Sequence, residues 1–196
     1  MHRAARVIAL FAAFSCAASA ARAQYSAHRR EGFWLGFGLG YGSSNVTCDQ
    51  CGSGPRVDGV TGFLKLGGTP NRNLRLGGAV NGWWHDDGVV TESMANVTTS
   101  VYVYPAGGGL FLTGGLGFSN YHWSDNYDNS APFDGIGWGF TGGVGYDIPL
   151  GRSVSLTPVV TYMYGGVGNV NEVGVGTART QWRQNVVDFA LGVTFH

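Results

Sequence analysis

Residues 32–42 read Gly-Phe-Trp-Leu-Gly-Phe-Gly-Leu-Gly-Tyr-Gly. From Phe33 onward every second residue is large and apolar, and the residues between them are glycine after Trp34. Only a β-strand places neighbouring side chains on opposite faces with a period of two. One face of this strand is therefore strongly apolar and the other is nearly bare. The pattern predicts a barrel whose outer face contacts lipid and whose interior is narrow.

The same alternation recurs along the chain and predicts seven further strands, at residues 59–68, 74–84, 89–104, 110–119, 136–148, 154–162 and 187–195. Pro158 lies on the apolar face of its strand, where its missing N–H predicts a bulge. A soluble lipocalin-like barrel is the structural alternative, but it would need charged residues on its outer face, and here the second face is mainly Gly and Thr.

The connections between these strands alternate in length. Polar stretches at 43–58, 85–88, 122–134 and 165–182 are the predicted loops at one end, and the last of them is expected to extend its hairpin beyond the membrane. Short turns are predicted at 69–73, 105–108 and 149–152. The predicted fold is all-β: an eight-stranded antiparallel up-and-down transmembrane β-barrel with short periplasmic turns and long extracellular loops. An even number of strands places both termini at the periplasmic end.

Residues 1–23 predict a cleaved export signal, because Arg3 and Arg6 precede an apolar core at 7–13 and Ala21-Arg22-Ala23 supplies small residues for cleavage. Lipidation at Cys16 is the alternative, and residues 13–15 are a poor lead-in for it. No later stretch approaches the ~20 apolar residues of a membrane-spanning helix. We therefore expect a signal peptide at 1–23, a periplasmic lead at 24–31 and a barrel domain at 32–196.

Charge and cysteine content narrow the possible partners. Without the signal, 9 basic and 12 acidic residues remain, a net charge of −3, which gives no reason to expect nucleic acid as a partner. Cys48 and Cys51 form the motif Cys-Asp-Gln-Cys, and in an exported chain this pair predicts a disulfide. A redox motif or half of a metal site would need a helix or a second ligand pair, and the sequence shows neither.

Over residues 32–196 the chain resembles the small eight-stranded outer-membrane β-barrel family, of the OmpA transmembrane domain, OmpX and opacity-protein type. The resemblance implies a location in the outer membrane of a Gram-negative-type bacterium. It also implies contact with outer-membrane lipids and lipopolysaccharide, and handling by periplasmic chaperones and the barrel-insertion machinery. The last strand is similar to the family's assembly signal, which alternates apolar residues and ends in an aromatic one; here these are Phe189, Leu191, Val193 and Phe195, with His196 as an overhang. The implied role is non-enzymatic, in envelope integrity or in surface contact with a ligand through the loops, with no cofactor.

By strand parity a set of polar side chains faces the lumen: Lys65, Arg75, Asn81, Glu92, Asn96, Asp147 and Asp188. An eight-stranded barrel is only wide enough for side chains to fill, and a lone buried charge is costly. We therefore expect a structural network of paired charges, with a narrow ion-conducting gate as the alternative. The acidic residues of the long loops are expected to be solvated and to form no metal site.

One stretch raises an enzymatic alternative. Tyr121-His122-Trp123-Ser124 places His122 and Ser124 two residues apart, on the lipid side by parity, with Asp125 and Asp134 downstream. A serine, a histidine and an acid can form a nucleophilic system. The arrangement is similar to that of the lipid A deacylases, outer-membrane barrels with His-x-Ser at the lipid-exposed rim. That family has Asn after the Ser and Glu as the acid, where this chain has Asp125 and Asp134, so we predict no enzyme and interpret these residues as hydrogen-bonding groups of the rim.

Overall fold

The computed structural model describes residues 31–49, 51, 54–126, 132–172 and 174–196. The predicted signal peptide and all but the last residue of the predicted lead lie outside the described residues. Within the described part, no helix has the length and apolar character needed to cross a membrane.

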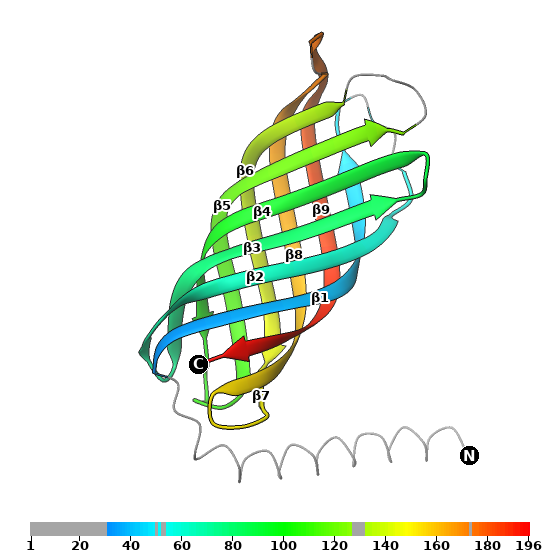
Figure 1. Ribbon diagram of the computed structural model, residues 1–196. Coiled ribbons are helices and arrows are strands. Elements are labelled where there is room, and N and C mark those ends of the chain that lie inside the picture. Colours follow the sequence, from blue (N-terminus) through cyan, green and yellow to red (C-terminus); the bar gives the residue numbers. More distant parts are fainter. Residues whose placement is uncertain (1–30, 50, 52–53, 127–131, 173) are drawn as a thin grey trace, which may run out of the picture.

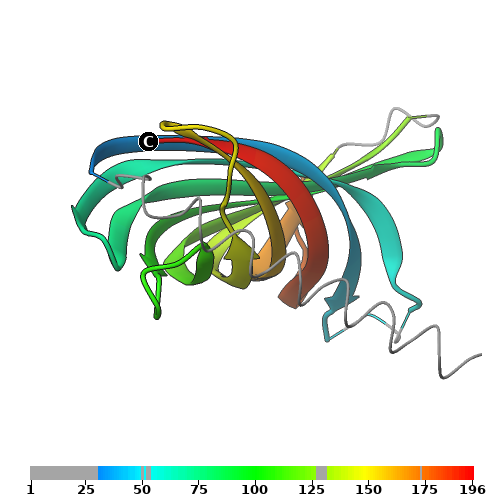
Figure 2. The same ribbon diagram turned by 90° about the horizontal axis from the view of Figure 1, so that it is seen from below.

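The strands form one antiparallel sheet that closes on itself (Figure 1). They are β1 (Gly32–Thr47), β2 (Val57–Asn71), β3 (Leu74–Asp86), β4 (Val90–Val103), β5 (Leu110–Asp125), β6 (Phe133–Tyr146), β7 (Ile148–Pro149), β8 (Val154–Glu172) and β9 (Gly176–Phe195). Each long strand pairs with its neighbour in sequence, and β9 pairs with β1. Figure 2 shows β9 (red) lying beside β1 (blue). The two-residue strand β7 pairs with β8 where β6 has ended, so eight long strands of the described chain make the barrel, as predicted.

Side chains alternate between the two faces of the sheet with the predicted parity. The outward set forms an apolar belt of exposed residues: Phe37, Leu39, Leu64, Leu112, Leu116, Phe118, Ile136, Trp138, Phe189 and Leu191. Several of these side chains are mostly exposed, with 66% for Leu116 and 72% for Phe118. An apolar patch this extensive on a monomer needs a non-aqueous neighbour. The belt is the surface that lipid covers in a membrane barrel.

Glycines on the inner face leave room for a few large inward side chains. A Cβ on Gly192 would lie 2.4 Å from Cζ of Phe63, and a Cβ on Gly145 would lie 2.3 Å from Cζ of Phe111. The Phe111 ring thus lies over its register partner on the neighbouring strand β6, and the Phe63 ring reaches across β1 to the backbone of β9. The glycines that leave the inner face nearly bare in the sequence therefore provide the space that these aromatic rings occupy in the lumen.

Several strands are longer than predicted. β5 continues to Asp125 and β6 begins at Phe133, so much of the predicted loop at 122–134 is strand. β1 and β2 likewise shorten the predicted loop at 43–58. Residues 165–182 lie almost wholly in β8 and β9, whose hairpin projects past the other strands at the top of Figure 1. The sequence interpretation gave these strands too little length, although it did expect the last hairpin to extend.

The bulge predicted at Pro158 is wrong. The β8–β9 register runs without a break through Pro158, which is opposite Leu191. Across the other edge of β8, Val159 is opposite Gly145 of β6 and Leu156 is opposite Ile148 of β7, so the register continues there too without an inserted residue. Pro158 lies in the short gap in pairing between these two pairs.

Candidate functional site

The lumen is filled by three clusters of buried apolar side chains at successive depths. The cluster nearest the short turns contains Trp34, Tyr102, Tyr104, Phe111, Val159 and Ala190. The next contains Trp83, Met94, Met163 and Val186, and the one nearest the extracellular end contains Tyr121, Val167 and Val170. Each of these side chains is at most 7% exposed. The barrel is therefore a packed body and not an open tube.

Arg75 and Asp147 form an ion pair in the lower lumen. Arg75 Nη1 lies 3.3 Å from Asp147 Oδ2, and both side chains are 2% exposed. Arg75 Nη1 also donates to the Tyr104 hydroxyl at 2.8 Å, and that hydroxyl donates to Asp147 Oδ2 at 2.9 Å. Thr157 Oγ1 donates to Asp147 Oδ1 at 2.9 Å, so both carboxylate oxygens have partners. The carboxylate of this buried charge pair is therefore fully paired, whereas Nε of Arg75 is buried without a hydrogen-bond partner among the described residues.

His196 extends this network toward the periplasmic end. Its Nδ1 lies 2.5 Å from Arg75 Nη2 and its Nε2 lies 2.9 Å from Ser155 Oγ. The residue that overhangs the aromatic end of β9 in the sequence is thus joined to the lumen. On the same strand, Phe189, Leu191 and Phe195 of the assembly signal point outward, while Val193 is only partly exposed.

Lys65 is held by aromatic rings. Its Nζ lies 5.0 Å from the ring centroids of Phe63 and Phe111 and 5.4 Å from that of Tyr102. These are cation–π distances. Among the described residues no carboxylate makes a salt bridge to Lys65.

Of the remaining lumen residues of the predicted set, Asp188, Glu92 and Asn96 have neutral partners and Asn81 Nδ2 has none. Thr61 donates to Asp188 Oδ2 at 3.1 Å, and Glu92 has the Tyr121 hydroxyl beside it. Asn96 donates to the carbonyls of Phe140 and Tyr164, each at 3.1 Å, and Nδ2 of Asn81 is buried without a partner. Sequence parity placed all these residues on the inner face. It did not show that, within the described chain, Arg75 and Asp147 make the one ion pair of the lumen.

The outer rim holds His122 and Asp134, which face each other across the β5–β6 ladder. His122 Nδ1 lies 2.6 Å from Asp134 Oδ1, and the two side chains are 40% and 47% exposed. Ser124 follows on the same face of β5, and Ser93 of β4 is the register partner of His122 on the other side. No hydrogen bond among the described residues joins Ser124 to His122. The structure thus pairs His122 with Asp134 and leaves Ser124 two residues further along the same face of β5.

Next to this pair the β6–β8 ladder opens. Pairing stops after Asp134, which is opposite Asn171, and resumes at Trp138, which is opposite Gly166. A surface depression is lined there by Asp134, Gly135, Ile136, Val167, Gly168, Asn169 and Asn171. Gly168 adopts a φ of 76°, a conformation that favours glycine, and this bends β8 away from β6. The sequence interpretation missed this opening, for which Gly165, Gly166 and Gly168 were the available signal.

Cys48 and Cys51 form a disulfide with Cα atoms 4.9 Å apart, as predicted. The loop that holds them contacts the β8–β9 hairpin: the Asp49 amide donates to the Thr180 carbonyl at 3.2 Å, and Thr180 Oγ1 donates to Asp49 Oδ2 at 3.1 Å. The disulfide therefore shapes a segment that joins two extracellular elements. Across the described chain, no three His, Cys, Asp or Glu side chains form a group that could hold a metal ion.

Comparisons with known proteins give matches in structure alone. No family model matches the sequence, and no curated protein matches it. Neisserial surface protein A superposes with a TM-score of 0.54 at 16% identity, covering 83% of this chain and 96% of its own. Ail, the attachment invasion locus protein of Yersinia pestis, solved in complex with the heparin analogue sucrose octasulfate, superposes with a TM-score of 0.55 at 12% identity, covering 84% and 99%. Together with the apolar belt, these matches show that the chain is an integral β-barrel with the fold of the small eight-stranded outer-membrane proteins.

Proposed function

We propose that this protein is a non-enzymatic outer-membrane barrel that contributes to envelope integrity and presents its extracellular hairpins to the surroundings. The observation that carries the proposal is the filling of the lumen by three clusters of buried side chains at successive depths, which supports a barrel without a passage. A barrel without a passage acts through its outer surface and its ends. Its outer surface is the apolar belt, which outer-membrane lipids and lipopolysaccharide would cover.

The extracellular end has the form of a contact surface. The β8–β9 hairpin projects beyond the other strands, and it carries Arg179 and Arg183 on its exposed side. The neighbouring loop is tied to it through Asp49 and Thr180. A ligand of the protein would bind at this end, and the folding route would use the periplasmic chaperones and barrel-insertion machinery that the resemblance implies.

The proposal is tested by reconstituting the protein in planar bilayers, after heat-modifiable gel mobility has shown that the sample is folded. We expect no conductance across the voltage range at which the bilayer itself is stable. Reproducible unit openings whose size changes in an Arg75→Gln variant would show that the lumen conducts, and the narrow-channel alternative would then hold.

The pair His122–Asp134 favours a second candidate, an acyl hydrolase of the lipid A deacylase kind. Asp134 binds Nδ1 of His122 at 2.6 Å, which leaves Nε2 available as a base. The Ser124 hydroxyl would add to an ester carbonyl while its proton passes to Nε2 and then to the departing alcohol oxygen. Water would cleave the acyl-serine and release the fatty acid.

Mass spectrometry of lipid A from cells that express the protein tests this candidate. If it is a hydrolase, lipid A loses one acyl chain in the presence of wild type and keeps it with Ser124→Ala. Ser93→Ala is the matched control, because Ser93 also lies beside His122 but across the β4–β5 ladder. Identical lipid A with and without the folded wild-type barrel would exclude the hydrolase and leave His122 and Asp134 as hydrogen-bonding groups of the rim.

A further inference from the structure

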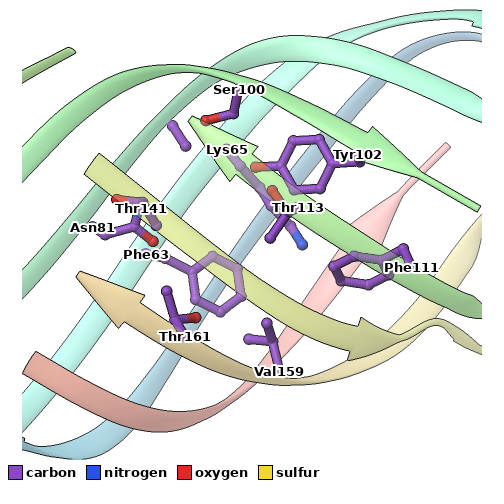
Figure 3. A pocket seen from close by; sticks show the side chains of 11 residues that line it. Phe63, Lys65, Asn81, Ser100, Tyr102, Phe111, Thr113, Thr141, Val159 and Thr161 are labelled. Atoms are coloured by element: carbon purple, nitrogen blue, oxygen red, sulfur yellow. The ribbon is translucent and has the colours of Figure 1, made fainter. Parts of the chain in front are cut away.

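A cavity of about 20 Å³ lies within the lumen at the depth of Lys65, large enough for one small particle the size of a water molecule or a halide ion. Figure 3 shows its lining side chains, which come from several strands around one space. They include Lys65, Asn81, Ser100, Tyr102, Thr113, Thr141 and Thr161, with Phe63, Ala79, Phe111 and Val159 as the apolar part. No Asp or Glu is among them.

Lys65 is the only lysine of the chain, and its side chain is built into this position. The residue is 6% exposed, and Gly36 of the adjacent strand makes room for it, since a Cβ there would lie 2.7 Å from Lys65 Cε. Its ammonium group makes no hydrogen bond to another described residue, although it is enclosed by three rings. An ammonium group has three donors, and leaving them unused in a low-dielectric interior is costly.

The nearest acid does not neutralise Lys65 by contact. Asp147 accepts hydrogen bonds from Arg75 and Tyr104 at Oδ2 and from Thr157 at Oδ1. The group of Lys65, Arg75 and Asp147 therefore carries two positive charges and one negative charge. The surplus positive charge lies at the cavity.

The cavity also presents neutral polar groups without a partner. Asn81 Nδ2 and Thr141 Oγ1 are buried and make no hydrogen bond among the described residues. Both can donate a hydrogen bond, as can the unused protons of Lys65. A cation would meet the ammonium charge and no carboxylate. We propose that this cavity binds a small monovalent anion of chloride size, held by Lys65 and by the Asn81 and Thr141 donors.

The single lysine makes a direct test practical. The mature full-length protein is folded in detergent micelles with lysine labelled at ¹³Cε and ¹⁵Nζ, so the side-chain spectrum contains one lysine, Lys65. Sodium bromide is then titrated against sodium gluconate at constant ionic strength, because gluconate is too large for the cavity. We expect the Lys65 resonance to shift and to saturate with bromide.

Thr141→Val removes one donor while preserving shape, and we expect it to weaken bromide binding roughly fivefold, the usual effect of losing one neutral hydrogen bond. Thr91→Val is the matched control, since Thr91 lies at the extracellular end of β4 and outside the cavity. It should leave the bromide affinity unchanged. A Lys65 resonance that does not move, that moves without saturating, or that responds equally in Thr141→Val and wild type would overturn the proposal and leave water as the occupant.

Discussion

Asp147 is the residue on which the lower lumen depends. It lies between β6 and β7, and its inward-facing side chain accepts hydrogen bonds from Arg75, Tyr104 and Thr157. Its backbone amide donates to the Gly109 carbonyl at 2.9 Å, which ties the interruption to the start of β5. A carboxylate so enclosed stabilises the barrel only while its cation is present.

Arg75→Met should therefore lower the free energy of unfolding by about 3–5 kcal/mol, because it leaves Asp147 charged and unpaired in the interior. Urea unfolding in lipid vesicles, followed by tryptophan fluorescence, measures the loss. The double variant Arg75→Met/Asp147→Asn is the control and should recover most of the stability, since it removes both charges. Equal urea midpoints for wild type and Arg75→Met would contradict the assigned role of this pair.

Asp87 offers a pH-dependent prediction outside the membrane. The backbone amides of Val90 and Val89 donate to its Oδ1 at 2.8 and 2.9 Å, and these bonds hold the pKa of the carboxyl below its usual 3.8. The pKa is lower in the folded turn than in the unfolded chain. The stabilisation of the turn by the Asp87 carboxylate is therefore fully present above the pKa of the unfolded chain, and it is lost as the pH falls through the pKa of the folded turn.

We expect the amide signals of Val89 and Val90 to lose their protection from hydrogen exchange as the pH falls below 3.8 and through the lower pKa of the folded Asp87 carboxyl, because the carboxylate is then protonated. Asp87→Ala should remove that protection at every pH and leave the unfolding of the barrel unchanged. Protection that persists in Asp87→Ala would show that another group orders the turn.

At the scale of the strand, the sequence predicted the centres well and the ends poorly. Inside the membrane one face contacts lipid and the other contacts packed side chains, so the residues alternate. Beyond the membrane the outer face meets water, and β8 continues through Gly166, Gly168 and Asn169 without an apolar outer face, while Val167 and Val170 still pack inward. The alternation of apolar and small residues disappears there although the backbone pairing continues. The strand predicted from that alternation therefore ends at the edge of the membrane.

The candidate sites show the same division. Strand parity placed Arg75 and Asp147 on the inner face, and their closeness to the short turns indicates similar depth. The partner of His122 depends on the β5–β6 register. The register depends in turn on the geometry of the loop between the two strands, which the sequence does not predict. The cavity beside Lys65 depends on the shapes of six strands at once, and no local pattern in the sequence predicts it.

A matched pair of glycines on β5 tests how tightly the strands approach. A Cβ on Gly117 would lie 2.0 Å from the Val97 carbonyl oxygen, whereas one on Gly114 would meet nothing within 4 Å. Gly117→Ala should cost about 1–3 kcal/mol of stability, because backbone must move to admit the methyl group. Gly114→Ala should be neutral or stabilising by up to about 1 kcal/mol. Urea midpoints that fall equally in both variants would indicate that strand flexibility, and not close approach, sets the cost.

At the scale of the whole molecule, the belt requires lipid. Leu116 in the belt is 66% exposed and Val175 at the hairpin tip is 76% exposed, so in water the two positions would be equivalent. In a bilayer they are not, because an arginine near the midplane costs about 2–4 kcal/mol and one outside the membrane costs almost nothing. Leu116→Arg should therefore lose stability by that amount in vesicles while Val175→Arg keeps the wild-type urea midpoint. Equal midpoints would contradict the membrane interpretation.

If the lumen is sealed as proposed, its three filled levels make the seal redundant. Truncating Trp34 or Trp83 to alanine would hollow out one level, and we expect the other two still to obstruct ions. Conversion of this barrel into a nanopore would then require all three levels to be cleared together, and a screen of single substitutions for leakiness should find none. Impermeability would be a collective property of the lumen that no single side chain controls.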